Sequence, residues 1–139
     1  MADPSYAKGQ NPIPRSLNAL ALLASGDRSY FPLLKKEAEW GASFTTEAMA
    51  TWYYGYIMLF LSEYRIATSD DSVMPGLKRL ALEAAHGQSA VGSWGHKFAQ
   101  PDGRLFGYGM MNSVSGQQST SCIFARGLAA MASMQPGSR

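Results

Sequence analysis

A segment of this chain repeats itself after 43 positions. Residues 24–38 align without gaps with residues 67–81, and seven of the fifteen pairs are identical, among them Asp27 with Asp70 and Pro32 with Pro75. A fixed period of about 20 to 50 residues is typical of stacked supersecondary units. A helical hairpin of that size buries only one face unless a neighbour stacks on it. The repeat therefore predicts an all-α chain built from helical hairpins that pack side by side.

Turn and capping signals separate the apolar segments into helices. We expect helices over about residues 14–25, 30–42 and 46–68, a fourth that ends near 86, and a last one over about 118–134. Including shorter pieces, the chain should contain about five to six helices. No run of valine or isoleucine alternates with period two, so strands are not expected beyond short pieces in the loop.

These helices predict one repeat domain with an unrepeated loop. Residues 1–13 are expected to be extended, and residues 135–139 to form a tail. A single α/α repeat domain covers 14–134, with hairpins over about 14–42 and 46–86 and a glycine-rich loop over 87–116.

The sequence also predicts which residues cap these helices and which residues form their buried faces. Ser29 is a candidate cap for the second helix, and Thr45 or Ser43 for the third. Asp27 and Asp70 share one repeat position, where an acid favours the start of a helix. The predicted buried stripes are Leu17, Leu20, Ala21 and Ala24 on the first helix, Phe31, Leu34 and Ala38 on the second, and Met74, Leu77, Ala81 and Ala84 on the fourth.

Composition excludes several classes of protein. The uncharged run between Glu47 and Glu63 has fifteen residues, whereas a membrane span needs about twenty, so we expect a buried helix and no membrane span. The net charge is +2, from 12 basic and 10 acidic residues scattered along the chain, so nucleic acid is not an expected partner. Cys122 is the single cysteine, which excludes an internal disulfide.

The N-terminal residues bear on the compartment. They contain no apolar run of the kind that a signal peptide needs. The chain as given is therefore expected in the cytoplasm, or outside the cell if it was excised from a longer secreted precursor.

The loop contains the pattern Gln88-x-x-x-Gly92-x-Trp94 directly after a helical hairpin. This pattern resembles the QW motif of the squalene and oxidosqualene cyclases and of the wider α/α-toroid group, which includes protein prenyltransferases. The resemblance implies a partial α/α toroid or solenoid, in which Gln88 closes a helix end and stacks on Trp94. The stretch from Thr51 to Asn112 also resembles a block in an uncharacterised bacterial family of toroid-like proteins, and that resemblance implies no activity.

Cyclase chemistry itself is not supported by the residues. The cyclases and ionising synthases of this group use Asp-x-Asp-Asp or Asp-Asp-x-x-Asp motifs, whereas this chain has only Asp70-Asp71, which the repeat explains as a cap. Cys122 lies among small residues, where a packing thiol is the commoner role than a zinc ligand. We therefore expect no metal and no cofactor.

The unrepeated loop holds the candidate site residues. His96 is a candidate acid or base with Asp102 as its orienting partner, and Trp94, Tyr108 and Asn112 are candidate ligand-binding residues. The alternative is a histidine bonded within the loop and an ordinary turn at Asp102.

Tyrosines of the third helix are further ligand-binding candidates. Tyr53 and Tyr56 could face a central cavity and stack on a sugar ring or an apolar ligand. Core packing is the commoner role for aromatic residues in such a helix.

Two function hypotheses follow. The first is a non-catalytic toroid or solenoid segment that packs against further repeats of a longer chain or against itself, or binds a glycan, a peptide or a small apolar ligand. The second is an enzyme domain, such as a hydrolase, lyase or cyclase-like enzyme, with its site in the loop from Gly87 to Asn112.

Overall fold

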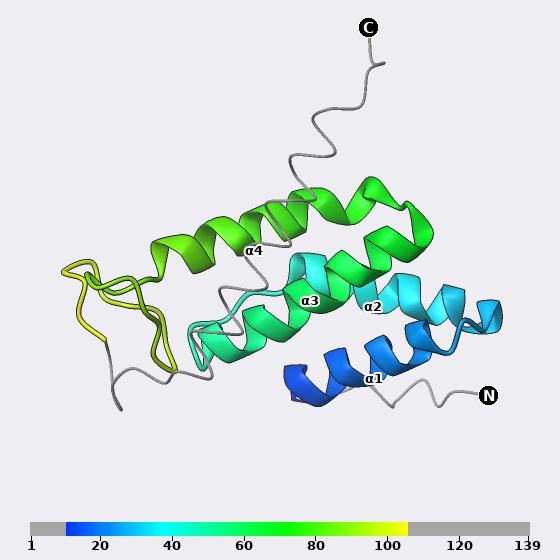
Figure 1. Ribbon diagram of the computed structural model, residues 1–139, viewed down its shortest axis with the longest axis horizontal. Helices are drawn as coiled ribbons and strands as arrows, with labels where there is room; N and C mark the ends of the chain where they lie inside the picture. The colour runs from blue at the N-terminus through cyan, green and yellow to red at the C-terminus, as the bar shows by residue number, and fades with distance from the viewer. Residues whose placement is uncertain (1–10, 106–139) are drawn as a thin grey trace, which may run out of the picture.

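The computed structural model describes residues 11–105, and in this part of the chain the fold is all-helical (Figure 1). The predicted all-α class is therefore confirmed for these residues, which contain no strand. The predicted last helix, the loop beyond residue 105 and both terminal segments up to residue 10 and after residue 134 lie outside the described residues. The elements are α1 (Pro12–Ala24), η1 (Arg28–Tyr30), α2 (Phe31–Ser43), α3 (Ala50–Thr68), η2 (Asp71–Val73) and α4 (Met74–His86), where η is a 3-10 turn.

The four α-helices form two layers with one helix of each hairpin in each layer. α1 packs most extensively on α3, and α2 packs on both α3 and α4. In Figure 1, α1 and α3 run in one direction, α2 and α4 run in the other, and both turns lie at the same end of the molecule. Equivalent helices of successive hairpins thus lie side by side.

The two turns have the same geometry 43 residues apart. η1 and η2 begin at Arg28 and Asp71, and the helices that follow begin at Phe31 and Met74, each with proline in its first turn. The backbone N–H of Ser29 donates to Oδ1 of Asp27 over 2.9 Å. Asp27 therefore caps the first turn, and the prediction of Ser29 as the cap is wrong.

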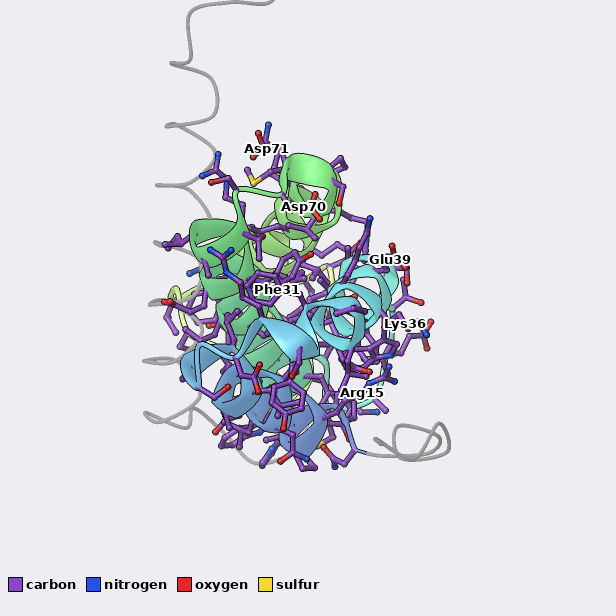
Figure 2. The ribbon with its side chains drawn as sticks, turned by 90° about the vertical axis from the view of Figure 1, so that its right-hand side faces the viewer. Arg15, Phe31, Lys36, Glu39, Asp70 and Asp71 are labelled. Atoms are coloured by element: carbon purple, nitrogen blue, oxygen red, sulfur yellow. The ribbon has the colours of Figure 1, made fainter. Side chains whose placement is uncertain are left out.

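The second turn repeats this hydrogen bond, because the backbone N–H of Ser72 donates to Oδ1 of Asp70 over 3.0 Å. The capping role expected for Asp27 and Asp70 is thus confirmed. Figure 2 views this end of the molecule, with Asp70 and Asp71 at the second turn and Phe31 just after the first.

Two helix starts differ from the predictions. α1 begins at Pro12 because the side chain of Asn11 accepts a hydrogen bond from the N–H of Ile13, so the segment predicted as extended ends earlier. α3 begins at Ala50 rather than near 46. The Thr46 hydroxyl bonds the N–H of Ala48, and Met49 has a left-handed φ of 51°, which ends the connection just before the helix. Neither Thr45 nor Ser43 caps α3.

The core lies between the layers and follows most of the predicted stripes. Leu34 and Ala38 of α2 and Met74, Leu77 and Ala84 of α4 are buried, as expected, and Phe31 and Ala81 pack against them. α3 provides the largest share of the core, with Tyr54, Ile57, Met58, Phe60, Leu61 and Tyr64.

The predicted stripe of α1 is wrong except at Leu20, which packs against the core. Ser16 and Ala19 are its buried residues, whereas Leu17, Ala21 and Ala24 are exposed and Leu20 is half-buried. The apolar sector of α1 is wide, and the edge that is covered is the one with Ser16 and Ala19. Periodicity alone does not say which edge of a wide sector a neighbour covers.

Polar contacts hold α1 against α2 within the first hairpin, and a close contact between α2 and α4 joins the first hairpin to the second. Arg15 of α1 forms an ion pair with Glu37 of α2, and its guanidinium lies 3.8 Å from the centre of the Trp40 ring. A Cβ on Gly76 of α4 would lie only 2.3 Å from the carbonyl oxygen of Ala42 in α2. The α2–α4 contact therefore depends on glycine at this position.

Candidate functional site

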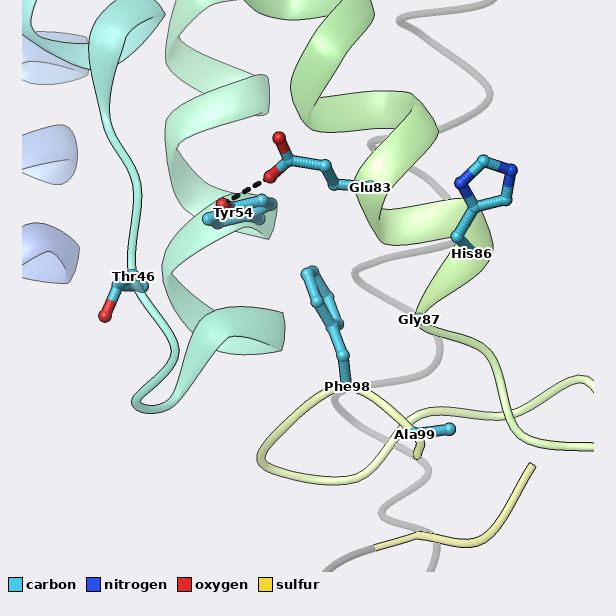
Figure 3. A pocket seen from close by; sticks show the side chains of 7 residues that line it. All are labelled: Thr46, Tyr54, Glu83, His86, Gly87, Phe98 and Ala99. Atoms are coloured by element: carbon cyan, nitrogen blue, oxygen red, sulfur yellow. Dashed lines mark hydrogen bonds between the residues drawn. The ribbon is translucent and has the colours of Figure 1, made fainter. Parts of the chain in front are cut away.

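An open pocket of about 310 Å³ lies where α3, α4 and the loop after α4 meet (Figure 3). α3 and α4 provide its polar wall, and the loop provides its aromatic wall. The lining residues are Thr46, Tyr54, Glu83, His86, Gly87, Phe98 and Ala99.

The polar wall is a hydrogen-bonded chain of three side chains. The Tyr54 hydroxyl donates to Oε2 of Glu83 over 2.6 Å, and Nη1 of Arg79 donates to Oε1 over 2.8 Å. Nη2 of Arg79 also donates to the backbone carbonyl of Phe44, which lies at the end of α2, over 2.6 Å. These groups thus satisfy one another and a helix-terminal carbonyl that would otherwise lack a donor.

The protonation states follow from these contacts. Burial of Tyr54 and its hydrogen bond to Glu83 raise the pKa of the Tyr54 phenol. Burial acts to raise the pKa of Glu83, but the hydrogen bonds from Tyr54 and Arg79 and the charge of Arg79 outweigh it and lower the pKa. At neutral pH the phenol is therefore protonated and the carboxylate ionised, so neither group is poised to transfer a proton.

The aromatic wall depends on a glycine. A Cβ on Gly87 would lie 2.3 Å from the Phe98 ring, so glycine is required where the loop leaves α4. Phe98 meets Tyr54 edge to face, with ring centres 5.2 Å apart. In Figure 3 the His86 imidazole points away from the Tyr54–Glu83 pair. Within the pocket wall, Tyr54 thus contacts both Glu83 and Phe98.

The loop candidates His96 and Asp102 have different partners. Nε1 of Trp52, in α3, donates to Nδ1 of His96 over 2.8 Å, and the two rings stack with centres 6.0 Å apart. Asp102 accepts the backbone N–H of Arg104 over 3.0 Å and lies 3.5 Å from its guanidinium. Neither His96 nor Asp102 is among the residues that line the pocket of Figure 3.

Trp94 ties the loop to the end of α4. Its side chain is 3% exposed, and its Nε1 donates to the carbonyl of Ala84 over 2.7 Å. Gln88 is exposed, and its amide donates to the carbonyl of Gly92 over 3.4 Å. The carbonyl of Ala84 thus accepts from the tryptophan of the pattern and from the backbone N–H of Gly87, and not from the glutamine.

The remaining candidates lie apart from the pocket or outside the described residues. Tyr53 is half-buried and meets Phe44 edge to face at 6.1 Å, and Tyr56 is half-buried. Tyr108 and Asn112 lie outside the described residues, as does Cys122. The pocket instead uses Tyr54 and Phe98. Tyr54 shares a helix face with Ile57, Met58 and Leu61, and a polar tip on such a buried face signals that it needs a partner.

A second hollow, of about 690 Å³, lies between the two turns. Arg28 and Lys35 provide positive charge there, and Asp70 provides negative charge. The hydrogen bonds from Ser72 are the main cause that lowers the pKa of Asp70, and the charge of Lys35 contributes. The lining residues are Arg28, Phe31, Pro32, Lys35, Tyr64, Ala67, Thr68 and Asp70.

Comparison with protein families gives one match, to the model described as Domain of unknown function (DUF6288), over residues 1–130. The chain belongs to this family. No curated protein and no solved structure matches it significantly. The DUF6288 match includes every described element, both pockets and all of the loop candidates.

Two further features of the DUF6288 chain bear on its chemistry. Among residues 11–105, no group of three or more histidine, cysteine, aspartate or glutamate side chains could hold a metal ion. None of the helices in that range combines the length and the apolar character that crossing a membrane requires.

Proposed function

We propose that this chain is a non-catalytic segment of an α/α helical array, a toroid or solenoid, whose role is to pack against further hairpins. One observation carries the proposal. The same turn and the helix that follows it, first α2 and then α4, recur 43 residues apart, and α1 lies beside its counterpart α3. In such arrays each hairpin is stabilised by its neighbours.

The use of the charged side chains supports a structural role. Arg15 pairs with Glu37 between α1 and α2, and Arg79 pairs with Glu83 while it binds the end of α2. A catalytic site normally requires a charged group that no structural contact explains. The proposal leaves out an enzyme site at His96 and Asp102, because these residues bind Trp52 and Arg104 respectively.

The proposal also leaves out a dedicated ligand. A glycan or a peptide that used Glu83 in the pocket of Figure 3 would have to share a carboxylate that already accepts hydrogen bonds from Tyr54 and Arg79.

Lengthening the chain by one unit tests the proposal. Residues 44–86 span one repeat period, so an additional copy of them placed after His86 should fold as a third hairpin on the second. We expect the helical signal per residue to persist, and both the midpoint and the denaturant dependence of unfolding to increase, because one more interface is buried.

A matched control keeps the length and breaks the joint. The same insertion with Phe60→Asp in the added copy places a charge at a position that is fully buried in α3, so the added unit should not dock. If the unaltered third unit is cleaved by protease as readily as this control, the array proposal fails.

A further inference from the structure

One face of α1 is apolar and exposed. Pro14, Leu17 and Ala21 follow one another at helical spacing and therefore share a face. The side chain of Leu17 is 45% exposed, although leucine is usually buried. We call these three residues the α1 face.

The counterpart of this face on α3 is covered. Ile57, Phe60 and Tyr64 lie 43 positions after the three residues of the α1 face, and at most 4% of any of them is exposed. Ile57 lies 3.2 Å from where a Cβ on Gly41 of α2 would be, and Tyr64 shares a hollow with Phe31 of α2. The first hairpin thus covers this face of α3.

On the side of the second hairpin that faces away from the first, residues are exposed whose counterparts in the first hairpin are covered. Ala42 of α2 contacts Gly76 of α4, and its counterpart Ala85 in α4 is exposed. Leu23 of α1 packs against the core, whereas its counterpart Ile66 in α3 is 52% exposed. Ile66 and Ala85 together are the α3/α4 face, the surface on which a next hairpin would pack.

We propose that the α1 face of one copy docks on the α3/α4 face of a second copy, head to tail. This inference rests on the proposed function. The two faces take the positions of the two sides of the joint between the hairpins, displaced by one repeat, so each is an apolar surface at a place that is covered inside the chain. Such a heterologous contact leaves one face free at each end and can add further copies.

The joint between copies should be weaker than the joint inside the chain. Leu33 of α2 takes the position that Gly76 has in α4. The α2 helix of one copy therefore cannot approach the α4 helix of the next copy as closely as α2 and α4 approach each other at Ala42 and Gly76 inside the chain. Association should therefore be reversible and depend on protein concentration.

Sedimentation velocity of the whole chain over a concentration series measures this association. Leu17→Glu alters only the α1 face and Ile66→Glu only the α3/α4 face, and each should raise the Kd at least tenfold because a charge is placed in an apolar contact. Val91→Glu is the matched control, since Val91 is 75% exposed in the loop after α4 and should leave the Kd unchanged.

Mixing the two variants tests the head-to-tail geometry. The intact α3/α4 face of the Leu17→Glu chain can accept the intact α1 face of the Ile66→Glu chain, so the mixture should form dimers with the unaltered affinity, but no larger species. A wild-type chain that stays monomeric at all concentrations would overturn the inference, and so would a mixture no better associated than either variant alone. The three-hairpin chain tests the array separately, because it needs no second copy.

Discussion

Asp27 and Asp70 accept the same backbone hydrogen bond, but their side chains differ in a second contact. The Tyr64 hydroxyl donates to Oδ2 of Asp70 over 3.0 Å, so Asp70 also fixes the end of α3 against the second turn. The position of Asp27 is more exposed. Two identical residues in equivalent turns should therefore differ in their contribution to stability.

Replacing each aspartate with alanine tests this difference. Asp70→Ala removes the cap and leaves the Tyr64 hydroxyl without its acceptor, which should lower the free energy of unfolding by about 1 to 2 kcal/mol. Asp27→Ala removes only a cap and should lower it less. Urea denaturation measures both values. In a Tyr64→Phe background the two losses should become similar, and equal losses in the unaltered background would contradict this explanation.

His96 and Asp102 are close in sequence but have different hydrogen-bond partners. His96 and Asp102 are six positions apart, yet His96 binds Trp52, which lies 44 positions earlier in α3. Asp102 accepts from Arg104 in a turn that includes Gly103 at a φ of 80°. The turn at Asp102 is predictable from Asp-Gly, whereas the partner of His96 depends on where the loop folds back.

At the scale of helices, the α2–α4 contact depends on Gly76. Alanine is a better helix former than glycine by about 1 kcal/mol, so propensity alone favours Gly76→Ala. The added Cβ, however, would lie 2.3 Å from the carbonyl oxygen of Ala42 and 2.6 Å from its Cβ. Backbone cannot move aside as a flexible side chain can, so the two helices would have to separate.

Gly76→Ala should therefore lower the free energy of unfolding by about 1 to 3 kcal/mol, the usual cost of overpacking. Gly41→Ala in α2 is the matched control, because its Cβ would meet only side-chain atoms of Ile57 and Leu61 at 3.2 and 3.3 Å. That substitution should cost less, and chemical denaturation of both variants measures the difference. A Gly76→Ala chain that is more stable than the wild type would show that the helices do not approach this closely.

The sequence predicted helices better than it predicted their connections. α2 lies within one residue of its predicted bounds and α4 ends at His86 as expected, because proline marks the first turn of both helices and Gly87 follows the end of α4. The start of α3 was misplaced because Thr46 and Met49 form a local turn that competes with the helix. The buried edge of α1 could not be assigned without the position of α3.

At the scale of the whole molecule, groups that titrate at acid and alkaline pH hold the second hairpin together. Glu83 and Tyr54 link α4 to α3, and Asp70 and Tyr64 link the second turn to α3. The hydrogen bonds from Ser72 are the main cause of the lowered pKa of Asp70, and in Glu83 the hydrogen bonds and charge of its partners outweigh burial. For Tyr54 and Tyr64, burial is the main cause that raises the pKa.

These pKa shifts predict that stability is highest over a middle range of pH and decreases in both acid and alkali. Asp70 and Glu83 have ordinary pKa values of 3.8 and 4.5 that folding lowers, so their contribution is present above these values and is lost as pH falls through the folded pKa. Tyr54 and Tyr64 have an ordinary pKa of 10.0 that folding raises, so their contribution is present below 10.0 and is lost as pH rises through the folded pKa.

Thermal unfolding followed by circular dichroism across the pH range measures this profile, and two substitutions separate its ends. Glu83→Gln keeps an acceptor for Tyr54 but does not titrate, so Tm should be lower at neutral pH and fall less steeply in acid. Tyr54→Phe removes the phenol and should make the alkaline fall less steep. Each substitution should change the slope most at its own end of the pH range, and to a smaller extent at the other end, because Glu83 and Tyr54 each contribute to the pKa shift of the other. A chain whose acid and alkaline slopes are the same in the wild type and both variants would show that the Tyr54–Glu83 link does not stabilise the joint between α3 and α4.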